Sequence, residues 1–158
     1  MTAEQTKIAE ESHVKAPWLN VYGVVPPHLD YPDCTMYEAV EHCAETYPNH
    51  TAYVFMGRKT TYRAMAAEID LCARALKATG VRPGDRITMA MPNCPQAVIM
   101  FYAINLVGAT ANMIHPLSGE KEIEFYLKES GSIFAVTLDQ FYHKFEAIRQ
   151  NVTLDNII

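Results

Sequence analysis

Short apolar runs alternate with longer stretches of helical spacing through most of this chain. Four of the runs have the length of a β-strand, and apolar residues recur every three or four positions between them. The four predicted strands are residues 86–91, 109–114, 133–137 and 156–158. Alternation of short strands with amphipathic helices is typical of a doubly wound sheet. We therefore predict an α/β fold with a mostly parallel sheet and helices on both of its faces.

The stretches of helical spacing have recognisable beginnings and ends. Thr35 and Glu38 have the spacing of a capping box at the start of the first helix. Gly80 stands where a left-handed cap is expected at the end of the second. Residues 95–107 are apolar on nearly every side, so we expect this helix to pack on more than one face. The last helix presents an apolar stripe made by Leu138, Phe141, Phe145 and Ile148.

Two further helix caps are predicted from single polar residues. Asn93 follows the strand over 86–91 and is expected to cap the helix after it, with a ligand contact as the alternative. Ser118 is expected to cap a helix from Gly119 to about Glu129.

The first third of the chain has a different pattern. Residues 51–56 are predicted to form a strand, residues 57–59 a turn and residues 60–62 a short second strand, which together make a hairpin. Residues 1–34 show no steady period and hold four prolines, which indicates an extended arm. We therefore divide the chain into an arm over 1–34 and an α/β unit over 35–158.

The last predicted strand ends together with the chain. A parallel strand is normally covered on both faces, and no residue after Ile158 supplies that cover. We therefore expect an incomplete, truncated domain. A short edge strand that truly ends the protein is the alternative.

Composition excludes several classes of function. The net charge is -5 and no Lys/Arg cluster occurs, so nucleic acid is not an expected partner. The most apolar stretch, residues 97–114, is interrupted by Asn105, Gly108 and Thr110, which favours a helix, a break and a strand over a membrane span. The four cysteines form no CxxC pair, so we expect free thiols and a cytoplasmic location.

Few residues carry recognisable chemistry. The glycine patterns of dinucleotide sites, P-loops and nucleophile elbows are absent, and the six histidines lack metal-ligand spacing. His115 follows the predicted strand over 109–114, and open α/β sheets bind ligands at the carboxyl ends of their strands. His115 is therefore the one candidate substrate-binding residue, with an ordinary loop position as the alternative. We predict no catalytic, cofactor-binding or metal-ligating residue.

An ordered set of short motifs resembles the adenylate-forming (AMP-binding) superfamily. The sequence Gly-Val-Arg-Pro-Gly-Asp-Arg-Ile at 80–87 resembles the family's helix end, turn and strand. Thr61-Tyr62 before it, and His115-Pro116 and Ser130-Gly131 after it, follow in the family's order. The resemblance covers about 35–158. His115 departs from the pattern, because many members have Asn before this proline.

The leader makes the resemblance strongest to long-chain fatty-acid–CoA ligases, because it contains Trp18, Pro26-Pro27 and Asp33-Cys34-Thr35. The resemblance implies the N-terminal part of an acyl-CoA synthetase of fatty acid metabolism. Such an enzyme activates a carboxylic, here fatty, acid with ATP and Mg²⁺ through an acyl-adenylate, and transfers the acyl group to coenzyme A.

The family places its phosphate-binding loop, its magnesium-linked acid and its catalytic lysine beyond the point reached at Ile158. The resemblance therefore implies that the 158-residue chain is inactive and binds none of ATP, Mg²⁺ and coenzyme A tightly. A small non-catalytic α/β module that binds a nucleotide or a protein is the alternative. An exposed sheet edge also allows a homodimer.

Overall fold

The structure is a computed structural model that describes residues 17–26 and 28–158. The described residues fall into two compact units, which divide between Asp33 and Cys34. The first unit contains one short 3₁₀ helix, η1 (Pro17–Val21), within the predicted extended arm. Residues 1–16 of that arm lie outside the described residues.

The second unit contains the predicted hairpin and the predicted alternation of strands and helices. Its elements in chain order are α2 (Met36–Thr46), β1 (Thr51–Phe55), β2 (Arg58–Thr61), α3 (Tyr62–Ala78), β3 (Arg86–Ala90), α4 (Pro95–Val107), β4 (Thr110–Met113), α5 (Glu120–Ser130), β5 (Phe134–Thr137), α6 (Asp139–Ile148), η2 (Arg149–Asn151) and β6 (Asn156–Ile157).

The four later strands form one sheet in the order β4-β3-β5-β6, and every neighbouring pair is parallel. Strand β3 therefore lies in the interior of the sheet, where Ile87 aligns with Ala111 on one side and Phe134 on the other. The antiparallel pair β1-β2 is a separate sheet. The predicted α/β fold with a parallel sheet and an N-terminal hairpin is confirmed.

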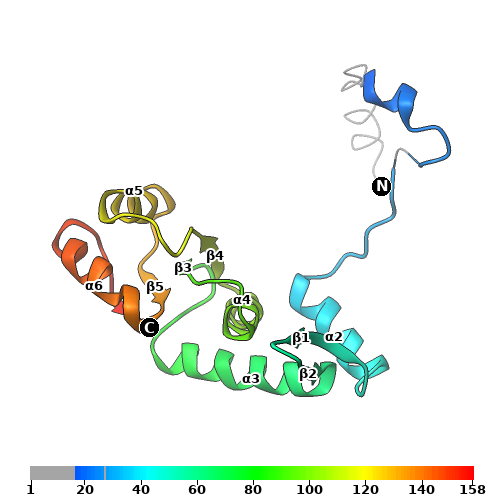
Figure 1. Ribbon diagram of the computed structural model, residues 1–158, viewed down its shortest axis with the longest axis horizontal. Helices are drawn as coiled ribbons and strands as arrows, with labels where there is room; N and C mark the ends of the chain where they lie inside the picture. Colours follow the sequence, from blue (N-terminus) through cyan, green and yellow to red (C-terminus); the bar gives the residue numbers. More distant parts are fainter. Residues whose placement is uncertain (1–16, 27) are drawn as a thin grey trace. The chain divides into compact units, whose positions relative to one another are not determined.

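Helices cover both faces of the parallel sheet (Figure 1). Successive side chains of a strand point to opposite faces, so β3 contributes to two apolar clusters. Ile87 and Met89 pack with α2, α3 and α4. Ala90 packs with Ala135 of β5 and with α5 and α6. Phe145 of α6 is fully buried in this second cluster.

The hairpin turn is tighter than predicted. Phe55 pairs directly with Arg58, so Met56 and Gly57 alone form the turn, and both have positive φ (46° and 81°) as a type I′ turn requires. The predicted turn over 57–59 is therefore wrong. The turn consists of Met56 and Gly57, and Arg58 and Lys59 belong to β2. Thr61 ends β2 and caps α3, since its Oγ1 accepts the Ala64 N–H at 3.3 Å.

Two of the predicted caps are confirmed. Thr35 Oγ1 accepts the Glu38 N–H at 3.1 Å, and the Glu38 carboxylate accepts the Thr35 N–H at 2.6 Å. The second of these bonds lowers the pKa of Glu38. Gly80 has a φ of 100°, and the Val81 N–H after it donates to the Leu76 carbonyl at 3.1 Å, as in a Schellman ending.

The two caps predicted from Asn93 and Ser118 are wrong. The N-cap of α4 is Cys94, which makes no side-chain capping bond. The N-cap of α5 is Gly119, whose N–H donates to Glu122 Oε2 at 2.9 Å. In both cases the cap lies one residue after the predicted polar side chain, and Pro95 or Glu122 supplies the N-terminal signal instead.

The long apolar stretch over 97–114 folds as predicted. Helix α4 ends at Gly108, which has a φ of 82°, and β4 begins two residues later. No helix among the described residues has both the length and the apolar character needed to cross a bilayer.

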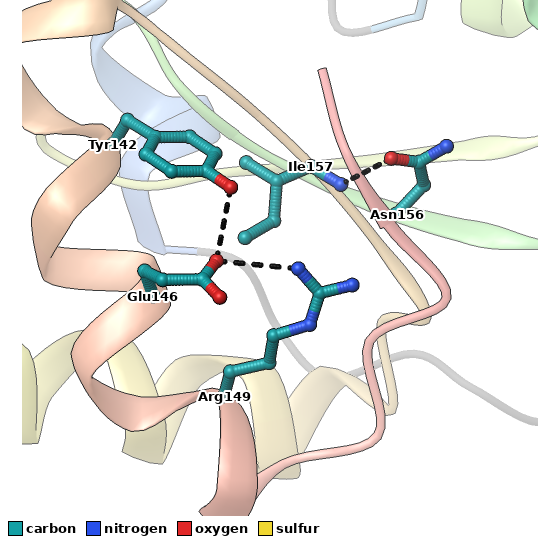
Figure 2. Close-up of polar contacts among 5 residues, drawn as sticks. All are labelled: Tyr142, Glu146, Arg149, Asn156 and Ile157. Atoms are coloured by element: carbon teal, nitrogen blue, oxygen red, sulfur yellow. Dashed lines mark hydrogen bonds and ion pairs between the residues drawn. The ribbon is translucent and has the colours of Figure 1, made fainter.

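The end of α6 is held by exposed polar contacts. Figure 2 shows Glu146 between Tyr142 and Arg149: its Oε2 accepts the Tyr142 hydroxyl at 3.0 Å and Arg149 Nη1 at 3.2 Å. The bond to Glu146 raises the pKa of Tyr142. In β6 the Ile157 N–H donates to Asn156 Oδ1 at 2.9 Å. Solvent screens exposed contacts of this kind, so they order the end of the helix only locally.

Candidate functional site

The sheet topology places a switch point between β3 and β5. From β3 the chain crosses to β4 on one side, whereas from β5 it moves to β6 on the other. Ligands of open α/β sheets bind beyond the carboxyl ends of the strands around such a point. At this edge the Thr137 hydroxyl donates to the Ala90 carbonyl at 3.4 Å, which joins the ends of the two strands.

The loop that contains His115 follows β4 at the same edge of the sheet. His115 is exposed, and its Nδ1 accepts the Leu117 N–H at 3.2 Å. Its carbonyl accepts the Ser118 N–H at 3.1 Å. A neutral imidazole that accepts at Nδ1 carries its proton on Nε2, so the ring's free donor is Nε2. A substrate contact by His115 remains a prediction.

A groove of about 470 Å³, the α4 groove, opens between the hairpin and the outer side of α4. Its wall is almost entirely apolar and aromatic. The lining residues are Tyr53, Val54, Phe55, Asn93, Cys94, Pro95, Ala97, Val98, Phe101, Tyr102 and Met113. Among the residues that the structure describes, none with a formal charge lines it. A volume between about 300 and 1,000 Å³ is typical of small-molecule sites.

Helix α4 can line a groove and fill the core at once because it is apolar all round. Ile99, Ala103 and Ile104 are buried in the core. Val98 and Phe101 lie on the other side of the helix, and both line the groove. We predicted that α4 packs on more than one face. One side of α4 does pack in the core, whereas its second apolar side faces the groove.

The hairpin supplies the opposite wall. Tyr53 and Phe55 are two residues apart in β1 and therefore point to one face, and their register partners in β2 are Thr60 and Arg58. A second recess of about 220 Å³ adjoins the groove there and shares Tyr53, Phe55 and Pro95 with it. Its further lining residues are Arg58, Thr60, Glu68 and Gln96. We call this second recess the polar recess.

In residues 17–26 and 28–158, no group of three His, Cys, Asp or Glu side chains is placed to hold a metal ion. We therefore assign no Mg²⁺ ligand to these residues and no step through the metal. Burial raises the pKa of the Cys72 thiol, which donates to Met100 Sδ at 3.8 Å, so this cysteine packs in the core. The arrangement is suited to binding an apolar ligand.

Of the residues that line the groove, the sequence indicated only Asn93 as a possible ligand contact. Tyr53 and Phe55 are separated from Val98 and Phe101 by more than forty positions, so their proximity depends on the tertiary fold. Two signals pointed to it: the apolar alternation at 53 and 55, and the absence of a polar side on residues 95–107.

Comparison with known proteins gives a consistent result. The family of AMP-binding enzymes matches residues 40–157. A long-chain-fatty-acid–CoA ligase of Bacillus subtilis is 30% identical over 143 residues, which are 90% of this chain and 26% of that protein. The ligase of the same name from Salmonella typhimurium is 28% identical and is also covered to 26%. The chain thus spans about a quarter of the length of these relatives.

Solved structures show the same fold. A fatty acyl CoA synthetase of Mycobacterium tuberculosis superposes with a TM-score of 0.73 at 28% identity, over 78% of this chain and 26% of that one. A long-chain-fatty-acid-CoA ligase of Archaeoglobus fulgidus reaches 0.76 at 21% identity, over 84% of this chain and 28% of that one, which is a likeness of fold. With the family match covering most of the chain, this protein belongs to the AMP-binding enzymes.

Proposed function

We propose that this chain is the N-terminal part of an acyl-CoA synthetase that acts on fatty acids. The whole enzyme would use ATP and Mg²⁺ to form an acyl-adenylate and would then pass the acyl group to coenzyme A. The family match over 40–157 carries this proposal. The names of the Bacillus and Salmonella relatives support a fatty acid as the substrate. Conversion to an adenylate makes chemical sense, because AMP leaves an acyl carbon far more readily than hydroxide does.

We further propose that the 158-residue chain does not catalyse this reaction by itself. Adenylate formation needs groups that neutralise the phosphates and orient the acid in one site. The chain corresponds to 26% of its relatives, and the described residues include no cluster that could hold Mg²⁺. Residues 1–34 would then be a leader arm, and residues 35–158 the first part of the AMP-binding domain.

Exchange of labelled pyrophosphate into ATP tests both statements, since it reports adenylate formation directly. With a fatty acid and Mg²⁺ present, a longer product of the same gene should catalyse exchange and the 158-residue chain should not. Exchange by the short chain would contradict its proposed inactivity. A longer product that binds ATP and fatty acid but shows no exchange would contradict the acyl-CoA synthetase assignment.

We propose a substrate contact for His115, because it lies beyond the carboxyl end of β4 with Nε2 free to donate. In the longer protein, His115→Ala should raise KM for the acid several-fold and change kcat little. An unchanged KM would show that this side chain only orders its own loop.

A non-catalytic binding module is the second candidate function, and the α4 groove favours it. The two functions differ in one observation, because a complete module predicts a stop codon directly after Ile158 in the natural gene, whereas the enzyme predicts that the reading frame continues. We also propose a cytoplasmic location, which the four free cysteines support. A homodimer through the open edges of β4 or β6 is testable by light scattering across concentrations.

A further inference from the structure

One side chain ties the loop that follows β4 to helix α6. Lys144 Nζ donates to the Leu117 carbonyl at 3.3 Å and to the Ser118 carbonyl at 2.9 Å. Hydrogen bonds from a charged donor are roughly twice as strong as neutral ones. Leu117 and Ser118 are the last two residues before Gly119, the N-cap of α5. Lys144 therefore joins α6 to the point where the loop enters α5.

Lys144 reaches this loop from a helix that is firmly packed. Its neighbour Phe145 and the later Ile148 are buried in the second apolar cluster, so α6 has a fixed position on the sheet. Lys144 itself is half-buried, and its ammonium lies 5.3 Å from the centroid of the Phe141 ring. Among the residues that the structure describes, no carboxylate forms an ion pair with Lys144. Its charge is therefore directed to the two loop carbonyls and to one aromatic ring.

Leu117 passes this restraint on to His115. Its carbonyl accepts the bond from Lys144, and its N–H donates to His115 Nδ1 at 3.2 Å. The Leu117 side chain is 63% exposed, so these two backbone contacts orient the residue more than side-chain packing does. Without the bond to Lys144, Leu117 can rotate and its N–H can turn away from the imidazole. A neutral imidazole without a donor at Nδ1 can carry its proton on either nitrogen.

We infer that Lys144 is a positioning residue, which keeps His115 in the tautomer that carries its proton on Nε2. The hydrogen bond made by one ring nitrogen decides whether the other carries the proton, so a residue that does not touch the ring can control its tautomer. The use of Nε2–H as a donor to the acid substrate rests on the proposed function. The tautomer itself rests only on the contacts that Lys144 and Leu117 make.

Nitrogen-15 NMR of the histidine rings in the 158-residue chain tests this inference, because the two tautomers of a neutral imidazole differ in their nitrogen shifts. The His115 signals are assigned as those that His115→Ala removes. At alkaline pH, His115 should be almost entirely in the Nε2–H form. Lys144→Met keeps a long unbranched side chain but removes the donor, so His115 should then show both tautomers. A mixture of tautomers in the unsubstituted chain would already overturn the inference, even if Lys144→Met failed to fold.

Two further variants separate the hydrogen bonds of Lys144 from its charge. Lys121→Met is the matched control, because Lys121 is exposed on α5 and makes no side-chain hydrogen bond or ion pair within the described part of the chain. It removes the same charge and should leave the tautomer of His115 unchanged. Lys144→Arg retains a cationic donor and should keep most of the Nε2–H form. Equal mixing of tautomers in Lys121→Met and Lys144→Met, or in both variants of Lys144, would overturn the inference. Far-UV circular dichroism establishes that each variant is folded.

A double-mutant cycle in the longer gene product measures the effect on the substrate. Lys144→Met should raise KM for the acid several-fold and change kcat little. It should add nothing in a chain that already carries His115→Ala, because Lys144 acts through His115. Additive effects, or an unchanged KM where His115→Ala alone raises it, would overturn the positioning role. If neither substitution changes KM while Lys144→Met still mixes the tautomers, the proposed substrate contact of His115 fails and the control of its tautomer by Lys144 stands.

Discussion

A relay of polar side chains crosses the interior of the sheet at Thr88. Asn112 Nδ2 of β4 donates to Thr88 Oγ1 at 2.9 Å, and the Thr88 hydroxyl donates to Ser132 Oγ at 2.9 Å. The Ser130 hydroxyl donates to the Leu127 carbonyl at 3.3 Å, which leaves the Ser132 hydroxyl to donate to Ser130 Oγ at 2.8 Å. Thr88 is fully buried, so the relay ties β4, β3 and the segment just before β5 together.

Replacement of Thr88 by valine keeps the shape of the side chain and breaks this relay. Asn112 then loses its acceptor and Ser132 loses its donor in the interior. Unmade buried hydrogen bonds cost about 1–3 kcal/mol, so Thr88→Val should lower the free energy of unfolding by that amount. Urea unfolding measures the loss, and the denaturant slope should stay unchanged.

Thr110→Val is the matched control for this measurement. Thr110 lies on the edge strand β4, is exposed, and makes no side-chain hydrogen bond within the described part of the chain. Its replacement should change the unfolding free energy by less than about 0.5 kcal/mol. Equal effects of the two substitutions would show that the relay does not stabilise the sheet.

At the scale of elements, the turn from α4 into β4 depends on a close approach between two loops. Gly108 ends α4 with a φ of 82°, and its carbonyl accepts the Gly84 N–H at 2.8 Å. A Cβ on Gly108 would lie 3.3 Å from Pro83 Cβ, which is tighter than ordinary contact. Gly84 has a similar φ of 88°, but a Cβ there would meet nothing within 4 Å.

This pair of glycines separates backbone strain from crowding. Gly84→Ala should cost about 1 kcal/mol, because an L-residue is strained at positive φ. Gly108→Ala should cost about 2 kcal/mol or more, because the methyl group must also displace Pro83. Urea unfolding of both variants gives the comparison. A Gly84→Ala loss as large as that of Gly108→Ala would mean that the contact with Pro83 contributes nothing.

The existence and order of the elements could be predicted from the sequence, because each has its own periodicity and stop signal. Their ends were harder to predict where two signals competed. Asn93 is the better capping side chain, yet Pro95 sets the start of α4 one residue later, with Cys94 as the cap. Met56 adopts a positive φ that its own side chain disfavours, because the pairing of Phe55 with Arg58 leaves only two residues for the turn.

At the scale of the whole molecule, the apolar core could be predicted but the α4 groove could not. Periodicity places Ile69 and Leu76 on one apolar face of α3 and Ile104 on an apolar side of α4, and all three residues are buried. Periodicity does not show which apolar side of α4 stays uncovered, because that depends on how far the hairpin lies from Val98. His115, chosen from its place after a strand, lies on a neighbouring loop and does not line the groove.

The core strand β3 and the hairpin differ in burial and in strand pairing, and this difference predicts how local stability varies across the second unit. Strand β3 is paired on both sides, and Ile87, Met89 and Ala90 are almost completely buried. Within the part of the chain that the structure describes, strands β1 and β2 pair only with each other, and β1 is exposed at both of its ends. Amide hydrogen exchange should therefore be slowest in β3, where it requires global unfolding, and much faster in the hairpin, where local opening suffices.

The Thr88→Val variant tests this difference in exchange rate between β3 and the hairpin. Hydrogen exchange detected by mass spectrometry gives the rate for peptides from each region. If β3 exchanges only through global unfolding, the variant should speed its exchange roughly tenfold for each 1.4 kcal/mol lost. The hairpin opens locally and does not share the relay, so its exchange rate should stay the same. Equal acceleration in both regions would mean that the hairpin and the parallel sheet open as one cooperative unit, despite forming separate sheets.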